Sequence, residues 1–276
     1  MDFIFDTHAH YNDKAFNEDR TTLLDSFTES GILGVINCGT DIEESENSIS
    51  LSEKYDFMYC AVGFHPEEIS KANENYLEEI RKMANHKKCV AIGEIGLDYY
   101  WVKDNKEEQK RIFTEQVILA NELNLPVIVH SRDAHNDTLE ILKKYKPKGV
   151  LHCFSGSVEV MKEVLKLGMY IGLGGAVTFK NARVPLEVAE KLPLDRLLLE
   201  TDCPYMSPVP YRGKRNQSTY ISFVAEKIAE VKNLTKEEIC TALEECSVDP
   251  GRRGETLDIF EFCALSDKIF EKIQKK

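Results

Sequence analysis

The chain has 276 residues and a formal net charge of −12 at pH 7; 42% of its residues are hydrophobic and 30% are charged. This acidic balance argues against a protein that coats nucleic acid through a broad basic surface. The sequence has no apolar stretch long enough for a transmembrane helix, and its first residues lack the basic flank and apolar core of a signal peptide, so we expect a cytoplasmic protein with no membrane partner.

Eight short apolar runs predict buried strands, because they are rich in Val, Ile and Leu and contain few charges. Gly or Pro often marks their ends. In chain order, the predicted strands are Phe3–Thr7, Ile32–Cys38, Met58–Gly63, Val90–Ile95, Pro126–Val129, Gly149–Cys153, Met169–Leu173 and Leu197–Thr201.

Helical patterns separate these runs. The clearest covers 105–123, where Ile112, Phe113, Gln116 and Val117 recur at three-to-four-residue spacing with charges elsewhere. Asp41 and Asp133 are candidate N-caps of two such helices. The predicted helices are Glu18–Ser30, Glu43–Lys54, Asn75–Asn85, Asn105–Leu123, Asp133–Tyr145, Val158–Leu167 and Pro185–Lys191.

Strand–helix alternation repeated eight times predicts an α/β fold with parallel strands and right-handed crossovers. Eight units favour closure into a (β/α)8 TIM-type barrel that spans 1–276 as a single domain. A doubly wound open sheet is the alternative. The stretch Thr241–Lys276, with its turn-like Asp249-Pro250-Gly251, is less clearly organised, and we treat 241–276 as an atypical C-terminal segment.

Eight cysteines are present, and none forms a CxxC pair, so the sequence predicts neither a thiolate zinc cage nor a thioredoxin-like site. Those in the predicted strands are expected to be buried, reduced thiols. Cys203, next to Asp202, is the only thiol that we consider for reactivity.

Ligand-type side chains follow the predicted strands at their C-terminal ends. In a closed barrel these ends converge on one face, where active sites are built. We therefore expect four imidazoles and two carboxylates there, with His65 beside them, a set that suits one or two divalent transition metals. The side chains concerned are His8, His10, His65, Glu94, His130, His152 and Asp202.

The sequence around each candidate also allows a simpler interpretation. Alternation places Asp6, His8 and His10 on one side of a strand, with Asp6 able to hold an imidazole, yet an HxH alone is weak. A carboxylate at Glu94, inside an apolar run, is costly unless it is paired or metal-bound. The alternative, a salt bridge to an interior Lys or Arg, finds no cation in the nearby predicted strands.

Other positions keep two interpretations as well. His130 and His152 at equivalent strand ends favour ligands over hydrogen-bonded core residues. Asp202 could bind metal and accept a proton from a water. His65 could contact a substrate oxygen or be a turn residue fixed by Pro66. The cations of 212–215 could bind phosphate or form a solvated loop, and the remaining histidines, His86 and His135, are expected to face solvent.

Such a ligand set is typical of two-metal hydrolysis. Paired cations about 3.5–4 Å apart generate hydroxide near neutral pH and stabilise charge on a phosphoryl group. Histidine-rich ligation favours zinc, manganese or iron. Because magnesium can also orient a phosphate, we expect two divalent ions and leave zinc, manganese and magnesium open.

Taken together, the residues resemble the TatD-type metal-dependent deoxyribonucleases, within the amidohydrolase-like barrels. The resemblance runs from about residue 3 to about residue 240, and the loops 174–175 and 211–216 are also similar. The usual Thr-rich segment and short helix near the family's C-terminus are replaced here after Cys246. The matching stretches are Phe5–His10, Gly63–Pro66, Gly93–Tyr100, Val127–Arg132, Leu151–Gly156 and Leu199–Tyr205.

The resemblance implies a (β/α)8 barrel that hydrolyses DNA phosphodiesters, trimming from the 3′ end. It implies that Glu94, as a bridging ligand, and Asp202 are catalytic, and that His65 and Arg212 contact substrate phosphate. The implied metal ligands are His8, His10, Glu94, His130, His152 and Asp202.

Two other functions are weighed against this one. A metal-dependent amidohydrolase acting on a carbonyl ester or amide would share the site, but many such barrels carry a carboxylated lysine where this chain has Glu94. A non-catalytic binding protein could use the same face, but the complete ligand set argues against it. The sequence gives no oligomeric state.

Overall fold

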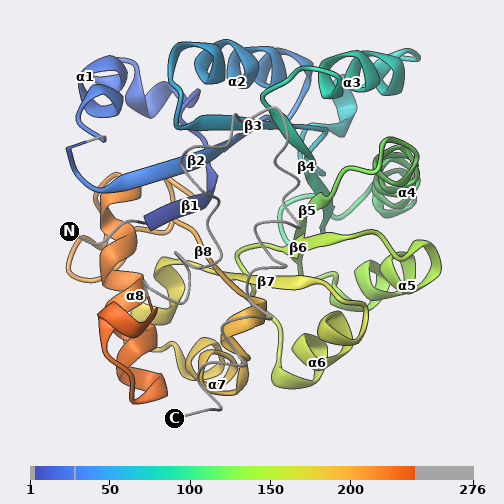
Figure 1. Ribbon diagram of the computed structural model, residues 1–276. Coiled ribbons are helices and arrows are strands. Elements are labelled where there is room, and N and C mark those ends of the chain that lie inside the picture. The colour runs from blue at the N-terminus through green and yellow to red at the C-terminus, as the bar shows by residue number, and fades with distance from the viewer. Residues whose placement is uncertain (1–3, 28, 240–276) are drawn as a thin grey trace. The chain divides into compact units, whose positions relative to one another are not determined.

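The structure is a computed structural model that describes residues 4–27 and 29–239. Within these residues eight strands form one sheet in the order β1 to β8, and a helix follows each strand (Figure 1). The strands are β1 (Ile4–Ala9), β2 (Ile32–Cys38), β3 (Met58–Val62), β4 (Cys89–Asp98), β5 (Val127–Arg132), β6 (Gly149–Leu151), β7 (Tyr170–Leu173) and β8 (Leu197–Leu199). The helices are α1 (Arg20–Asp25), α2 (Ile42–Lys54), α3 (Tyr76–Ala84), α4 (Lys106–Leu123), α5 (His135–Tyr145), α6 (Val158–Lys166), α7 (Arg183–Lys191) and α8 (Ile221–Lys232).

The strand pairing is that of a (β/α)8 barrel. The pairs from β3 to β7 are parallel and follow chain order. The first strand also lies beside the last, because Ala9 and Cys203 form a parallel bridge and the Thr7 hydroxyl donates to the Leu199 carbonyl at 2.9 Å. Chain-order neighbours and a last-to-first contact confirm the predicted barrel class over the open doubly wound sheet.

Contacts divide the chain into two compact units. The terminal unit consists of Met1–Val35 and Gly172–Lys276, and the central unit is Ile36–Ile171. One border between the units falls inside β2 and the other falls inside β7. The single-domain organisation stays a prediction.

The strands match the predicted positions, with differences at their ends that bear on the site. Strand β4 continues to Asp98, so Glu94 lies inside the strand and not at its end. Strand β5 continues to Arg132 and includes His130. The apolar runs marked the buried part of each strand, whereas the polar ends remained in the ladder because the neighbouring strand supplies hydrogen-bond partners, as in the pairing of Asp98 with Arg132.

Two predicted helix starts have opposite outcomes. The carboxylate of Asp41 accepts a hydrogen bond from the Glu44 N–H at 2.9 Å, which confirms it as the N-cap of α2. The Asp133 prediction is wrong, because α5 begins one residue later than expected for that cap and its N-cap is Ala134. Asp133 instead has a φ of 54°, a left-handed conformation that Asp tolerates better than most residues.

Two helices differ more strongly from the prediction. The helix expected over 18–30 is only α1, because the hydroxyls of Ser26 and Ser30 donate to the carbonyls of Leu23 and Ser26 and so compete with helical bonding. Helix α8 was not predicted, although its buried positions recur at helical spacing.

Two buried glutamines of α4 fix the backbone near the predicted site residues of the central unit. Gln116 accepts from the Phe64 N–H at 2.7 Å and donates to the Phe64 carbonyl at 3.1 Å. Gln109, two turns earlier on the same helix face, does the same for Asp98, at 2.8 and 2.9 Å. The helix thus replaces ladder partners for two strand ends, directly before His65 and at the end of β4.

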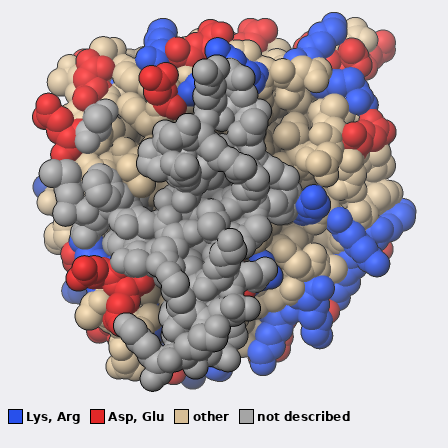
Figure 2. Space-filling view, viewed as in Figure 1, with Lys and Arg blue, Asp and Glu red and all other residues tan. Residues whose placement is uncertain are grey.

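The charged surface of the central unit is mixed. Along the upper edge of the face in Figure 2, over α2 and α3, Lys and Arg side chains lie among Asp and Glu side chains. Lys71, for example, pairs with Asp41 at 2.6 Å and with Glu68 at 2.7 Å. None of the helices in the described ranges has the length and apolar character needed to cross a bilayer. The segment 241–276, including the predicted turn at 249–251, lies outside the described residues.

Candidate metal centre

In the central unit, one buried carboxylate contacts three imidazoles. The Glu94 Oε1 atom lies 2.7 Å from His152 Nε2, 3.0 Å from His130 Nδ1 and 3.3 Å from His65 Nε2. Glu94 lies in β4 and His130 in β5, whereas His152 directly follows β6 and His65 lies in the segment after β3. Burying a carboxylate is costly unless polar or charged groups surround it, and the imidazoles meet that requirement. The structure therefore brings together all four predicted residues of this unit.

Asp98, which the sequence interpretation missed, completes this cluster. Its Oδ2 atom lies 3.0 Å from His130 Nε2, so the His130 ring is held between two carboxylates. Burial lowers the pKa of His130, but the hydrogen bonds to Asp98 and Glu94 outweigh it and raise the pKa to about 9. Burial raises the pKa of Asp98, but the bonds from His130 and two backbone N–H groups lower it overall. Asp98 orients the ring and leaves Nδ1 for a metal.

Hydrogen bonding also fixes the His65 ring. Its Nδ1 atom accepts from the Glu67 N–H at 3.2 Å, so the proton of the neutral ring lies on Nε2. That N–H faces the Glu94 carboxylate. The turn thus fixes the ring, and the ring presents a donor to the cluster. Its contact with substrate stays a prediction.

Strand geometry directs the Glu94 side chain. The pairing of β4 with β5 shifts register between Ile92 and Ile95, and such irregularities change the direction in which a side chain points. Just beyond, Gly96 has a φ of 146°, and a Cβ atom there would lie 2.0 Å from the His130 carbonyl oxygen. Glycine is therefore required for β4 to approach β5 beside the ligands.

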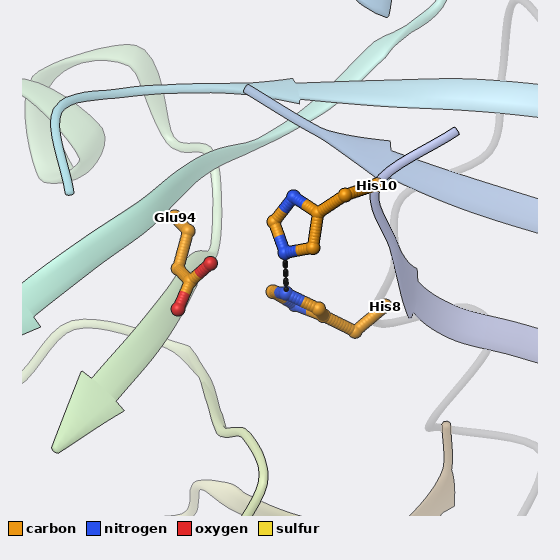
Figure 3. Close-up of side chains that lie close together, drawn as sticks. All are labelled: His8, His10 and Glu94. Carbon is orange, nitrogen blue, oxygen red and sulfur yellow. Dashed lines mark hydrogen bonds between the residues drawn. The ribbon is translucent and has the colours of Figure 1, made fainter. Parts of the chain in front are cut away.

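In the terminal unit, a second cluster forms around the start of the barrel. The Nε2 atoms of His8 and His10 face one another at 2.9 Å (Figure 3), which confirms that alternation directs both rings to one side of β1. Asp202 Oδ1 lies 3.5 Å from His10 Nε2 and 3.7 Å from His8 Nε2. Backbone bonds hold this arrangement: the Asp202 N–H donates to the His8 carbonyl, and the His10 N–H donates to the Cys203 carbonyl.

Asp6 does not hold an imidazole, contrary to the sequence interpretation. Its carboxylate accepts from the backbone N–H groups of His8 and Thr201 and from the hydroxyls of Thr201 and Ser218. Complete burial raises the pKa of Asp6 to about 6 although these bonds lower it. Asp6 therefore joins β1 to the segment after β8 and fixes the backbone on which His8 lies.

Cys203 is not a reactive thiol. Its side chain is buried, and burial raises the pKa of the thiol well above its usual value, whereas reactive cysteines are partly exposed with a lowered pKa. Cys38, Cys60 and Cys89 are buried thiols, as predicted, whereas Cys153 is only partly buried.

The basic loop after the last strand is divided in its contacts. Arg215 pairs with Asp19 at 2.6 Å, so its charge is neutralised. The exposed Arg212 guanidinium lies 3.8 Å from the centroid of the Phe179 ring and contacts none of the predicted ligands. Its part in binding substrate stays a prediction.

The two histidines expected to face solvent differ. His86 pairs with the exposed Glu53 at 3.2 Å. His135 is only partly exposed, and its ring lies edge-on to Phe154 with Nε2 buried. Burial lowers the pKa of His135. The prediction is wrong for His135 because the start of α5 packs against the segment after β6.

The ligand distances in the terminal cluster fit metal ligation, and those in the central cluster are shorter. Two ligands of a tetrahedral ion, each about 2.1 Å from it, lie about 3.4 Å apart. The pairs His10–Asp202 and His8–Asp202 span 3.5 and 3.7 Å. The remaining pairs are at hydrogen-bond distance and need only small shifts. Imidazole and carboxylate together suit zinc and manganese.

Comparison with known proteins shows which family the chain belongs to. A family model described as TatD related DNase matches residues 5–248. The chain belongs to the TatD family. Among TatD relatives, it is 44% identical over 241 residues to the uncharacterized metal-dependent hydrolase YabD of Bacillus subtilis, covering 86% of this chain and 94% of that protein. It is 34% identical to the 3′-5′ ssDNA/RNA exonuclease TatD of Pectobacterium parmentieri, covering 82% and 91%.

A solved structure supports the same assignment. The crystal structure of YjjV, a TatD homolog from Escherichia coli, matches with a TM-score of 0.82 and 34% identity over 88% of this chain and 95% of that one. The protein is thus a metal-dependent hydrolase of the TatD family with a (β/α)8 barrel.

Proposed function

We propose that this TatD-family hydrolase cleaves the phosphodiester bonds of DNA and removes nucleotides from the 3′ end. The observation that supports it most is the Glu94 cluster, in which three imidazoles surround one buried carboxylate. A relative of similar length is named as a 3′-5′ exonuclease. The cytoplasmic location expected from the sequence belongs to this proposal.

Six side chains are proposed to hold two divalent ions, which we expect to be zinc, manganese or magnesium. In the central unit they are Glu94, His130 and His152, with His130 oriented by Asp98. In the terminal unit they are His8, His10 and Asp202. When bound, the ions supply Lewis acidity toward a phosphoryl group.

The remaining chemistry belongs to the side chains. The Asp202 side chain is 17% exposed, so its carboxylate can accept a proton from the attacking water. Glu94, at 5%, acts as a ligand. His65 Nε2–H is proposed to donate to a substrate oxygen, and the Arg212 guanidinium to contact a phosphate further along the strand.

Digestion of labelled DNA tests this function. Single- and double-stranded oligonucleotides labelled at the 3′ or the 5′ end are incubated with each metal and with excess chelator. We expect the 3′ label to be released first, and only with metal. His130→Ala should abolish cleavage while the circular dichroism spectrum stays unchanged.

His86→Ala is the matched control, because it removes an imidazole of the same unit that contacts Glu53 and the Lys88 N–H and none of the proposed ligands. Full digestion in excess chelator would contradict the proposal. Turnover of carbonyl esters or cyclic amides in place of DNA, measured side by side, would favour the amidohydrolase alternative.

A further inference from the structure

Two neighbouring aromatic side chains after β4 are exposed. Trp101 is 61% exposed and Tyr100 is 44% exposed, and their ring centroids lie 4.8 Å apart at an angle of 86°. Single exposed apolar residues are ordinary, but two adjacent large rings leave a continuous aromatic surface open to a ligand.

A cation lies against the same rings. The Arg132 guanidinium is 4.2 Å from the Tyr100 ring centroid and 5.4 Å from that of Trp101. Within residues 4–27 and 29–239 no carboxylate pairs with Arg132, in contrast to Arg81 and Arg111 of the same unit. Its charge is therefore available to an anion, and stacking holds the side chain in place.

Asp98 connects this surface to the Glu94 cluster. Its Oδ1 atom accepts from the N–H groups of Tyr100 at 2.8 Å and Trp101 at 2.7 Å, while Oδ2 contacts His130. Arg132 follows His130 by two residues on β5, so both side chains lie on one side of the strand. One carboxylate thus fixes both the aromatic loop and a proposed metal ligand.

We propose that Tyr100, Trp101 and Arg132 form a stacking platform for a nucleobase of single-stranded DNA near the scissile phosphate. The proposal rests on the proposed function, since it states how the substrate of that site is held. Aromatic rings beside a cation are the usual means of binding single strands without sequence preference. Bases inside a duplex already stack on one another, so the platform selects unpaired ends.

The platform can be observed directly because Trp101 is the only tryptophan in the chain. A single-stranded oligonucleotide with phosphorothioate linkages, which resists cleavage, is titrated in the presence of Mg²⁺. We expect saturable quenching of the Trp101 fluorescence, and none with an abasic oligonucleotide of equal length or with a duplex closed by loops at both ends.

Variants then measure the contribution of each side chain to affinity by fluorescence polarisation of a labelled oligonucleotide. Trp101→Ala should weaken binding about tenfold or more, the usual effect of losing one base–aromatic stack, and Trp101→Phe should retain most of it. Arg132→Ala should weaken binding of base-containing and abasic strands alike. Ile118→Ala, which removes another exposed apolar side chain of this unit, is the matched control and should change neither.

The outcomes separate this inference from the proposed function. The platform would be overturned if the Trp101 fluorescence did not change at oligonucleotide concentrations at which the polarisation signal is saturated. It would also be overturned if Trp101→Ala lost equal affinity for base-containing and for abasic strands. Digestion of DNA by the wild-type protein without quenching rejects the platform alone. Quenching without digestion in any metal supports the platform and rejects the hydrolytic function.

Discussion

The two ligand clusters hold their imidazoles in different ways. In the central unit three rings contact one oxygen of the buried Glu94, and Asp98 holds one ring from behind. In the terminal unit His8 and His10 contact one another, and Asp202 lies farther away. Among the described residues, the Asp6 carboxylate accepts hydrogen bonds from backbone N–H and hydroxyl groups and not from an imidazole.

The two clusters differ in how much their carboxylates are buried and therefore in how easily water reaches them. Glu94 is almost fully buried and concentrates negative charge on the rings, which suits an ion that stays in place. Asp202 is partly exposed and can exchange a proton with a water. A base needs access to the reacting water, whereas a permanent ligand gains from low dielectric. We therefore expect the Glu94 cluster to decide metal content and Asp202 to decide the rate.

The largest effect is expected from Glu94→Gln, which keeps the shape of the side chain but removes the charge that all three rings contact. The proposed DNA cleavage should slow by roughly a hundred- to a thousandfold or more, and the metal content measured by elemental analysis should fall with it. Asp202→Asn should lose comparable activity but retain more metal.

Glu53→Gln is the matched control, because this exposed carboxylate pairs with His86 in the same unit and should leave both quantities unchanged. If Glu94→Gln kept full metal content and activity, the Glu94 cluster would not be a metal site.

The second effect concerns pH. Because the pKa of His130 is about 9, its ring carries a proton at neutral pH that a metal ion must displace. Affinity for Mn²⁺ should therefore rise up to about tenfold per pH unit as the pH increases toward 9, and then level off. Calorimetric titration between pH 6.5 and 8.5 with the Asp202→Asn protein measures this, since its central cluster is intact. Affinity that does not change with pH would contradict it.

The sequence predicts the ligands better than the groups that orient them. His8, His10, Glu94 and His130 each stand in or after an apolar run, so a strand pattern alone places them. The residues Glu94 and Asp98 are four apart, on the same side of β4, but the predicted strand ended at Ile95 where the apolar run stops. A longer strand would have revealed Asp98.

Partners from distant parts of the chain were beyond local patterns. Asp6 bonds to Thr201 and Ser218, about two hundred residues away, which no alternation in β1 could indicate. The barrel itself was predictable because each strand–helix unit repeats the same local signal. Helix α8 carries the same local signal, because its buried residues recur at helical spacing.

Asp98→Asn should have a smaller effect than Glu94→Gln. It keeps the shape but weakens the hydrogen bond that orients His130, and loss of such a partner typically lowers metal affinity about 10–100-fold. The pH at which affinity levels off should also fall, because one of the two carboxylates that raise the pKa of His130 is gone.

Asp137→Asn separates this effect from a general loosening of the loop. Asp137 accepts from the Tyr99 hydroxyl at 2.7 Å and supports the same loop without contacting His130. Its replacement should leave metal affinity unchanged. Equal losses in the two variants would mean that Asp98 acts on the loop and not on the ring.

Asp6→Asn should change metal affinity least of these variants. Its main effect should be on the free energy of unfolding. The pKa of Asp6 is about 6 in the folded protein, above the ordinary value of 3.8 for an aspartate, because burial disfavours the charged form. A raised carboxyl pKa contributes stability that is present below about pH 3.8 and is lost as the pH rises through about 6. The shift corresponds to about 3 kcal/mol of unfolding free energy.

Asn carries no such charge, so the wild-type protein should lose about 3 kcal/mol relative to Asp6→Asn between pH 3 and pH 8. Denaturant unfolding of both metal-free proteins at several pH values measures the difference, in which other titrating groups cancel. Parallel stability curves would show that Asp6 ionises normally. In that case hydroxyl and backbone donors would suffice to stabilise the buried charge of Asp6. The two clusters would then differ only in that Asp98 contacts an imidazole and Asp6 does not.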